Sequence, residues 1–309
     1  MNFNEVLPER DNRTMTVMDQ LNDPRPSFSL ELWPPRTPQA SARLSETIPQ
    51  LAELKPTFVS ITYGAGGSTR ERTHELVVEL AMTPGILPFA HLSCAAHSVA
   101  ELREILARYL NAGVTNIVAL RGDPPLASDL PLPDGELLFA SQLVDLIRDC
   151  GPFTIAVAAH PEGHPQSKDS SEDLYHFCEK LDKADFAITQ FFFRAETYFD
   201  FIDRVRKQHI NKPILPGIIA PTSISSLLKM SELSGAEIPR ELKDAFAGIS
   251  SDPASVRKVG VEAAINLARQ LLEEGVPGIH VYSMNSMVST VEIHEGIADL
   301  CSSDLEYPH

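Results

Sequence analysis

The stretch TNIVALRG, residues 115–122, is nearly continuous in apolar residues and ends in an arginine and a glycine. Before it lies SVAELREILARYLNA (98–112), which begins with a serine and a downstream glutamate, carries apolar residues three or four positions apart, and stops at Gly113. The first pattern is typical of a parallel strand covered on both faces. The second is typical of a capped amphipathic helix. Together they predict a helix followed by a buried parallel strand.

The same alternation is repeated along the chain. The other apolar runs are SFSLEL (27–32), TFVSITY (57–63), ILPFAHLSC (86–94), FTIAVAAH (153–160), FAITQFF (186–192), KPILPGII (212–219) and GIHVYSM (278–284). Helical patterns stand between the runs, for example at 69–80, 226–233 and 254–274. Strand–helix alternation implies a parallel sheet. Eight such units favour an α/β fold of the (β/α)8 TIM barrel type over an open doubly wound sheet.

The chain of 309 residues shows no Pro/Ser-rich linker that would divide it. We therefore predict one catalytic barrel domain over residues 26–305, preceded by an N-terminal arm over residues 1–25. The segment 223–274 is longer than one crossover needs, so extra helices are expected between strands seven and eight. The segment 122–136 contains four prolines, and a loop of this length is usually functional or disordered.

Composition excludes several classes of protein. The chain has 42 acidic and 26 basic residues, a formal charge of −16, which argues against nucleic-acid binding and against attachment to an anionic membrane. Its four cysteines are far apart and form no C-x-x-C motif, so reduced thiols are expected rather than disulfides or a metal site. The first residues lack an apolar signal region, and no stretch is long enough to span a bilayer. We predict a cytoplasmic protein; a homo-oligomer is compatible with these features.

Polar residues end most of the predicted strands, where barrels of this kind carry their chemistry. In chain order the strand-end residues are Glu31, Thr62, His91, Arg121 with Gly122 and Asp123, His160 followed by His164, Gln190, Gly217 and Tyr282. A purely structural barrel could end its strands in any solvated residue. The pattern alone therefore leaves a functional and a structural interpretation open.

Individual residues leave the same choice. Glu31 precedes Pro34 and Pro35, which hold the backbone extended, and a carboxyl among apolar neighbours can serve as a general acid; the pattern by itself favours a solvated carboxylate. Arg121 to Asp123 could bind an anion or form an ordinary polar turn.

Three further motifs give weaker signals. HPEGHP (160–165) favours ligand-binding or loop-capping histidines over a metal site, because its prolines disfavour helical ligand spacing. The glycine loop at 64–67 could contact a phosphate or be a plain turn. Phe191 to Phe193 indicate core packing, and Gln190 could be an amide partner for a heterocycle.

The segments LELWPPR (30–36), FVSITYGAGG (58–67), HLSC (91–94), IVALRGD (117–123), HPEGHP (160–165), ITQFFF (188–193), LPGI (215–218) and HVYSMN (280–285) resemble, in order and spacing, those of methylenetetrahydrofolate reductases. The resemblance spans roughly residues 27–300. It implies a barrel that holds FAD at the strand C-termini and accepts hydride from NADH or NADPH. It also implies reduction of 5,10-methylenetetrahydrofolate to 5-methyltetrahydrofolate by a ping-pong mechanism, in one-carbon metabolism and methionine supply.

The resemblance also implies roles for particular residues. Glu31 matches the general acid that protonates folate N10, and Asp123 matches a carboxylate beside the flavin and the pterin. Gln190 and Tyr282 match folate contacts. Flavin-site positions are matched by Thr62, His91, Leu120, Arg121, Gly122, Asp123, Ala158, His164, Asp173 and Lys180. His160 stands at a flavin-site position where a tyrosine is usual, and Phe139–Ala140 stand where bacterial members have Tyr–Ala.

The chain departs from the family pattern at His160, Glu179, Ser226, Met230 and Ser286. These departures keep open direct hydride transfer from NAD(P)H to the folate without flavin. The polar residues at the strand ends leave a second alternative open, a non-redox barrel that binds folate or transfers a methyl group.

Overall fold

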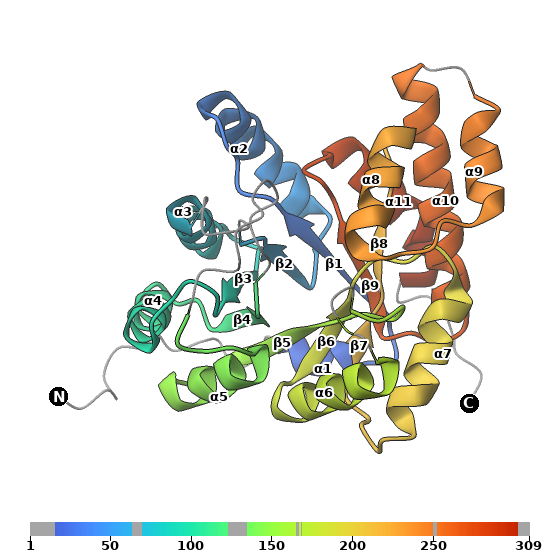
Figure 1. The fold of residues 1–309 in the computed structure, drawn as a ribbon. Helices are drawn as coiled ribbons and strands as arrows, with labels where there is room; N and C mark the ends of the chain where they lie inside the picture. Colours follow the sequence, from blue (N-terminus) through green and yellow to red (C-terminus); the bar gives the residue numbers. More distant parts are fainter. Residues whose placement is uncertain are drawn as a thin grey trace.

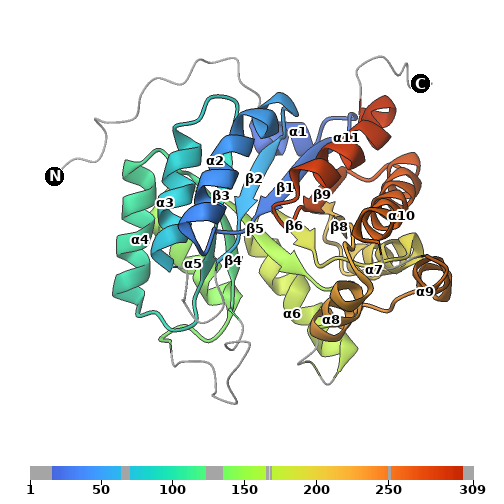
Figure 2. The same cartoon turned by 90° about the horizontal axis from the view of Figure 1, so that it is seen from above.

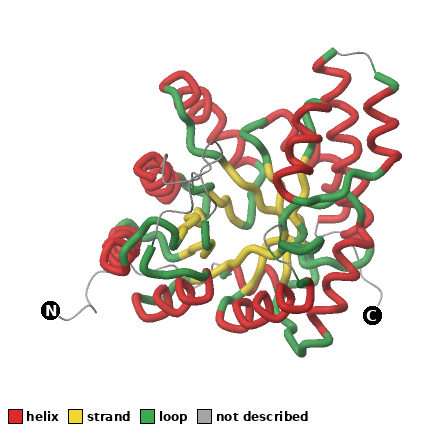
Figure 3. Tube along the Cα trace, viewed as in Figure 1, coloured by secondary structure: helices red, strands yellow, loops and turns green. Residues whose placement is uncertain are grey.

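The computed structural model describes residues 16–63, 70–122, 135–164, 167, 169–249 and 252–301. Parallel strands lie at the centre and helices surround them (Figures 1 and 3). The strands are β1 (Ser27–Leu32), β2 (Phe58–Ile61), β3 (Pro88–Ser93), β4 (Asn116–Leu120), β5 (Thr154–Ala159), β6 (Phe186–Thr189), β7 (Ile214–Leu215), β8 (Gly217–Ile219) and β9 (Gly278–Tyr282). All paired neighbours among these strands are parallel. The predicted TIM barrel is confirmed.

The seventh apolar run supplies two of these strands because Pro216 interrupts it. Strand β7 pairs with β6, and β8 pairs with β9. Proline has no backbone N–H to donate to a ladder, but the carbonyl of Pro216 still accepts a hydrogen bond from the His280 amide at 3.0 Å. The run 214–219 therefore closes the barrel between the sixth strand and the last one.

The helices begin and end close to the predicted positions. They are α1 (Val17–Leu21), α2 (Pro38–Glu53), α3 (Arg70–Ala81), α4 (Val99–Asn111), α5 (Ala140–Cys150), α6 (Ser170–Lys183), α7 (Ala195–Arg206), α8 (Ile224–Ser234), α9 (Arg240–Ala247), α10 (Pro253–Glu273) and α11 (Met287–Cys301). Ser98 and Glu101 form the expected capping box of α4. Helices α8 and α9 are the extra helices predicted before α10. Figure 2 shows α3 and α4 on one side of the strands and α9 and α10 on the other.

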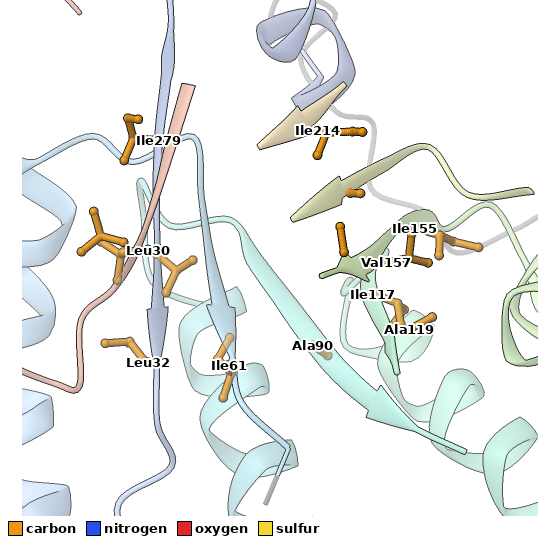
Figure 4. Close-up of a cluster of buried hydrophobic side chains, with 14 of the residues drawn as sticks. Leu30, Leu32, Ile61, Ala90, Ile117, Ala119, Ile155, Val157, Ile214 and Ile279 are labelled. Atoms are coloured by element: carbon orange, nitrogen blue, oxygen red, sulfur yellow. The ribbon is translucent and has the colours of Figure 1, made fainter. Parts of the chain in front are cut away.

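Alternation along each strand divides the barrel into an outer and an inner set of side chains. Leu30, Leu32, Ile61 and Ile117 belong to the large cluster that packs between strands and helices, drawn in Figure 4. A second cluster contains Phe58, Phe89, Phe186, Val118, Ala156, Ile188, Leu215, Val17 and Leu21. We call this second cluster the barrel floor.

The barrel floor is tightly packed. The rings of Phe58 and Phe89 have centroids 4.6 Å apart, and Val17 and Leu21 of α1 are each only 3% exposed. Helix α1 therefore contributes two core side chains from within residues 1–25, and the predicted domain boundary at residue 25 stays a prediction. Because the floor fills one end of the barrel, the described strands leave room for a ligand at the opposite end, where they terminate.

The described residues also bear on membrane-spanning helices, metal sites and disulfides. No helix among them is long and apolar enough to cross a membrane. No group of three or more histidine, cysteine or acidic side chains among them could hold a metal ion. The four cysteines are free thiols.

Candidate functional site

A cavity of about 1510 Å³ opens at the C-terminal ends of the strands. The predicted residues that line it are Glu31, Thr62, His91, Leu120, Arg121, Gly122, Phe139, Ala140, Ala158, His160, His164, Asp173, Lys180, Gln190 and Tyr282. The structure thus brings together every predicted site residue that it describes. Asp123 and the glycine loop at 64–67 lie outside the described residues.

Glu31 is near the end of β1, with its side chain on the inner face of the barrel. One carboxyl oxygen, Oε1, accepts hydrogen bonds from Thr62 Oγ1 at 3.0 Å and from Trp33 Nε1 at 3.2 Å. The other, Oε2, lies 3.4 Å from His91 Nε2. The residue is 7% exposed. The solvated carboxylate that the residue pattern favoured is therefore wrong, because neighbouring strands enclose this side chain.

Burial controls the charge of both members of the Glu31–His91 pair. Desolvation raises the pKa of Glu31 to about 7, although the hydrogen bonds from Thr62 and Trp33 oppose this rise. Burial lowers the pKa of His91 to about 3. His91 is therefore neutral at neutral pH, and Glu31 is close to half protonated. A carboxylic acid in this condition can donate a proton near pH 7.

Tyr282 and Gln190 line the cavity near Glu31. Tyr282 is paired directly with Glu31 in the β1–β9 register, and its hydroxyl donates to the Thr189 carbonyl at 2.6 Å. Burial, and then the charge of Glu31, raise the pKa of Tyr282 well above its usual value, so this phenol is neutral. The Gln190 Oε1 accepts a hydrogen bond from the Phe191 amide at 3.1 Å, which leaves its amide NH₂ available to a ligand. Phe192 belongs to the core, whereas Phe191 lines the cavity.

The end of β4 brings backbone close to the cavity. Gly122 has a φ of +97°, and a Cβ at this position would lie 2.1 Å from Ser93 Oγ. Ser93 Oγ in turn donates to the carbonyl of Arg121 at 3.0 Å. Only glycine fits both the dihedral angle and the space. The turn therefore presents bare backbone to whatever occupies the cavity.

The ends of β5 and α6 carry the cationic part of the site. Lys180 Nζ donates to the carbonyl of Ala158 at 2.8 Å, and burial lowers the pKa of this amine to about 8. Asp173 Oδ2 accepts from the His164 amide at 3.0 Å. The His160 and His164 rings are 4.7 Å apart, and His160 Nδ1 is buried without a hydrogen-bond partner among the described residues. These groups could bind an anionic, hydrogen-bonding ligand.

The departures from the family pattern occupy different places. Met230 lines the cavity from α8, and Ser226 donates to its sulfur at 3.6 Å. Glu179 lies at the cavity edge beside His176, 3.7 Å from its Nδ1. Ser286 donates to Ser289 Oγ at 3.0 Å.

Three residues of the site have roles that the sequence reasoning did not single out. Trp33 contacts Glu31 directly, and Asn285 contacts the backbone of Trp33 at 2.8 and 2.9 Å. His280 is fully buried below Glu31, with Nδ1 2.9 Å from Ser29 Oγ and its ring stacked on Phe58. The only sequence signal for them was their place in the motifs LELWPPR and HVYSMN.

His280 predicts a loss of stability in acid. Burial lowers its pKa from 6.5 to about 3, so between these values the unfolded chain binds a proton that the folded chain does not. The stabilisation is complete above pH ~6.5 and is lost as the pH falls. We expect this residue alone to lower the free energy of unfolding by about 2 kcal/mol between about pH 7.5 and pH 5. His91 and His160 act in the same direction, and Glu31 in the opposite one.

Urea unfolding at these two pH values measures the effect. His280→Gln should reduce the difference between them by about 2 kcal/mol, whereas His176→Gln, a matched change at a side chain that is 63% exposed, should leave it unchanged. An equal pH dependence in wild type and His280→Gln would contradict the assignment.

Comparison with known proteins gives concordant results. A family model described as methylenetetrahydrofolate reductase matches residues 16–298. A 5,10-methylenetetrahydrofolate reductase of Escherichia coli (strain K12) is 38% identical over 270 residues, covering 87% of this chain and 88% of the relative. That of Pectobacterium carotovorum is 37% identical over 262 residues, covering 84% and 86%. Methylenetetrahydrofolate reductase 1 of Schizosaccharomyces pombe is 33% identical over 279 residues, or 88% of this chain and 46% of the relative.

Solved structures share the fold. A protein from Clostridium thermocellum, described as binding two copies of 5-methyl-5,6,7,8-tetrahydrofolic acid, superposes with a TM-score of 0.66 at 16% identity, covering 91% of this chain and 98% of that one. The C-terminal domain of a chitinase from Desulfitobacterium hafniense superposes with a TM-score of 0.52 at 13% identity, covering 90% and 99%. At these identities the likeness concerns the fold alone.

Proposed function

Because the chain belongs to the methylenetetrahydrofolate reductase family, we propose that it reduces 5,10-methylenetetrahydrofolate to 5-methyltetrahydrofolate with FAD as cofactor and NADH or NADPH as reductant. The observation that carries the proposal is Glu31, a buried carboxyl inside the cavity whose pKa of about 7 lets it donate a proton at neutral pH. Groups with a pKa shifted toward neutrality inside a cavity cluster at catalytic sites, which supports a chemical role for Glu31.

In the proposed reaction Glu31 donates its proton to N10 of the folate. The five-membered ring then opens and leaves an electrophilic iminium at N5, which accepts hydride. Gln190 and Tyr282, which both line the cavity, would contact the pterin, and Tyr282 would contribute a neutral hydroxyl. Asp123 stays a prediction for the group beside the iminium.

The residues present fit FAD. Gly122 offers backbone at a point where any Cβ would collide with Ser93, and His160 carries a buried nitrogen without a partner among the described residues. Lys180 and Arg121 would hold the anionic part of the cofactor, with Ala158 and Ala140 leaving room beside it. When bound, FAD supplies the carrier that takes hydride from the nicotinamide and gives it to the folate. One cavity for both substrates supports the ping-pong order.

A spectrum of the purified protein tests the flavin assignment. We expect flavin absorbance that NADH bleaches and methylenetetrahydrofolate restores. Lys180→Met should raise the Kd for FAD by about tenfold or more, because a charge-assisted hydrogen bond is lost. Titration of apoprotein with FAD measures this Kd. Lys207→Met, at an exposed position that does not line the cavity, is the control and should change the Kd by less than about twofold. A colourless protein that takes up no added FAD would exclude the flavin.

Direct hydride transfer is the second candidate, favoured by His160 in place of the usual tyrosine and by the acidic Glu179 at the edge of the same part of the cavity. It predicts folate reduction by rigorously flavin-free protein. Strict dependence on added FAD would exclude it. A non-redox folate-binding barrel, the third alternative, would bind folate and never oxidise NAD(P)H.

A further inference from the structure

Trp33, the one tryptophan of the chain, lies directly beside Glu31. Its indole Nε1 donates to Glu31 Oε1 at 3.2 Å, and its side chain lines the cavity. The residue is 42% exposed, so its ring is not needed to fill the core. An exposed indole that donates its N–H to a buried carboxyl points to a role in the site.

The backbone of Trp33 is held at two points by one side chain. Asn285 Oδ1 accepts from the Trp33 amide at 2.8 Å, and Asn285 Nδ2 donates to the Trp33 carbonyl at 2.9 Å. Asn285 itself has a φ of +56°, a conformation that asparagine tolerates better than most residues. Pro34 and Pro35 follow Trp33 and restrict the chain further. The indole therefore starts from a fixed backbone position.

The two donors to Oε1 differ in their freedom. The Thr62 hydroxyl has a single proton and can give it either to Glu31 Oε1 or to the Leu32 carbonyl at 3.2 Å. The indole has one N–H, and Glu31 Oε1 is its hydrogen-bond acceptor among the described residues. Trp33 is therefore the constant donor to Oε1 and Thr62 the variable one.

An oxygen that already accepts two hydrogen bonds is a poor place for a third proton, since its lone pairs are used. Glu31 Oε2 accepts no hydrogen bond from the described residues and lies 3.4 Å from His91 Nε2. Protonation of Glu31 is thus directed to Oε2.

We propose that Trp33 is a positioning residue that makes Oε2 the oxygen from which Glu31 donates its proton, and that Asn285 holds Trp33 in place for this task. The catalytic meaning of this arrangement rests on the proposed function, whereas the coupling between Trp33 and Glu31 does not.

None of the described groups that face Glu31 is expected to titrate near neutrality, so Glu31 is the group expected to do so. His91 from β3 has a pKa lowered to about 3, and the pKa of Tyr282 from β9 is raised well above its usual value. Thr62 from β2 does not titrate in this range. Asp123 lies outside the described residues. A fluorescence transition caused by Asp123 would persist in the Glu31→Gln variant described below.

Trp33 makes the coupling directly observable, because all tryptophan fluorescence comes from this residue. In the ligand-free protein we expect the emission to change with pH about a midpoint near 7, the pKa of Glu31. Glu31→Gln should abolish this transition, and Asn285→Ala should reduce its amplitude by half or more. Emission that does not change between about pH 5.5 and 8.5, or that titrates equally in Glu31→Gln, would overturn the proposal.

Trp33→Phe tests the consequence for proton donation. Loss of a donor to the carboxylate should move the alkaline limb of the folate half-reaction upward by about 0.5–1 pH unit and lower kcat about tenfold, with little change in KM. The double variant with Asn285→Ala should behave like Trp33→Phe alone, because Asn285 acts through Trp33. Tyr175→Phe, an exposed aromatic outside the cavity, should leave the pH profile unchanged.

The positioning role and the proposed function are contradicted by different outcomes. An unshifted pH profile in folded Trp33→Phe would overturn the positioning role. Absence of folate reduction in the wild-type protein would instead refute the proposed function, while the fluorescence titration would still decide whether Trp33 and Glu31 are coupled. If Trp33→Phe does not fold, the wild-type and Glu31→Gln titrations decide alone.

Discussion

Glu31→Gln is expected to lower the rate of folate reduction by about 10²- to 10⁴-fold, the range that a general acid contributes. Glutamine keeps the shape of the side chain and can still accept from Thr62 and Trp33, but it has no proton with the required acidity. Oxidation of NADH by the flavin should continue at close to the wild-type rate, since this step needs no proton from Glu31. Stopped-flow measurement of the two half-reactions separates these effects.

Glu162→Gln is the matched control for this experiment. Glu162 is another carboxyl that lines the cavity, and burial raises its pKa as well. Unlike Glu31, it accepts a hydrogen bond from the backbone amide of Glu237. Both half-reactions should change by less than about threefold in this variant. Survival of both half-reactions in Glu31→Gln would show that the acid is a different residue.

Gly217→Ala is expected to cost about 3 kcal/mol of stability, in the range for forcing atoms into a packed interior. A Cβ on Gly217 would lie 2.3 Å from the Thr189 carbonyl oxygen and 2.5 Å from the Tyr282 ring. That oxygen cannot retreat without breaking its hydrogen bond with Tyr282. The seam between β8 and β9 and the part of the cavity lined by Tyr282 should therefore be disturbed together. Under the proposed function, this lowers both the Tm and the affinity for folate.

Denaturant unfolding and folate titration measure the two effects in one variant. Gly248→Ala provides the comparison, because the nearest atom to its Cβ would be the Asp244 carbonyl at 3.7 Å. We expect this control to lie within about 0.5 kcal/mol of wild type. A Gly217→Ala protein with unchanged stability would mean that β8 moves freely against Tyr282.

Much of the fold could be predicted because its signals are local. The apolar runs, the Ser98 cap of α4 and the glycine that follows that helix each depend on a few neighbouring residues. The inner positions of the strands also follow from the alternation of two, so residues that end different strands could be expected in one cavity. The interruption at Pro216 was not predicted, because a proline at that position is compatible with one strand or with two.

The parts of the site that escaped prediction depend on contacts between distant segments. Asn285 and Trp33 are 252 positions apart, and only closure of the barrel brings them together. The burial of Glu31 likewise depends on His91 of β3, Tyr282 of β9 and Thr62, which directly follows β2. The residue pattern could identify Glu31 as a strand-end carboxyl. Its burial, which raises its pKa so that it still carries a proton near neutral pH, is a property of the assembled barrel.

The barrel floor has a consequence for the traffic of ligands. Phe58, Phe89 and Phe186 fill the barrel from below, and Val17 and Leu21 of α1 close that end. The barrel is thus closed at one end and open at the other. A molecule that enters at the strand ends leaves by the same opening, so in the proposed ping-pong order each product departs before the next reactant binds. Product release through this one opening can therefore limit the rate of turnover even when proton donation from Glu31 is fast.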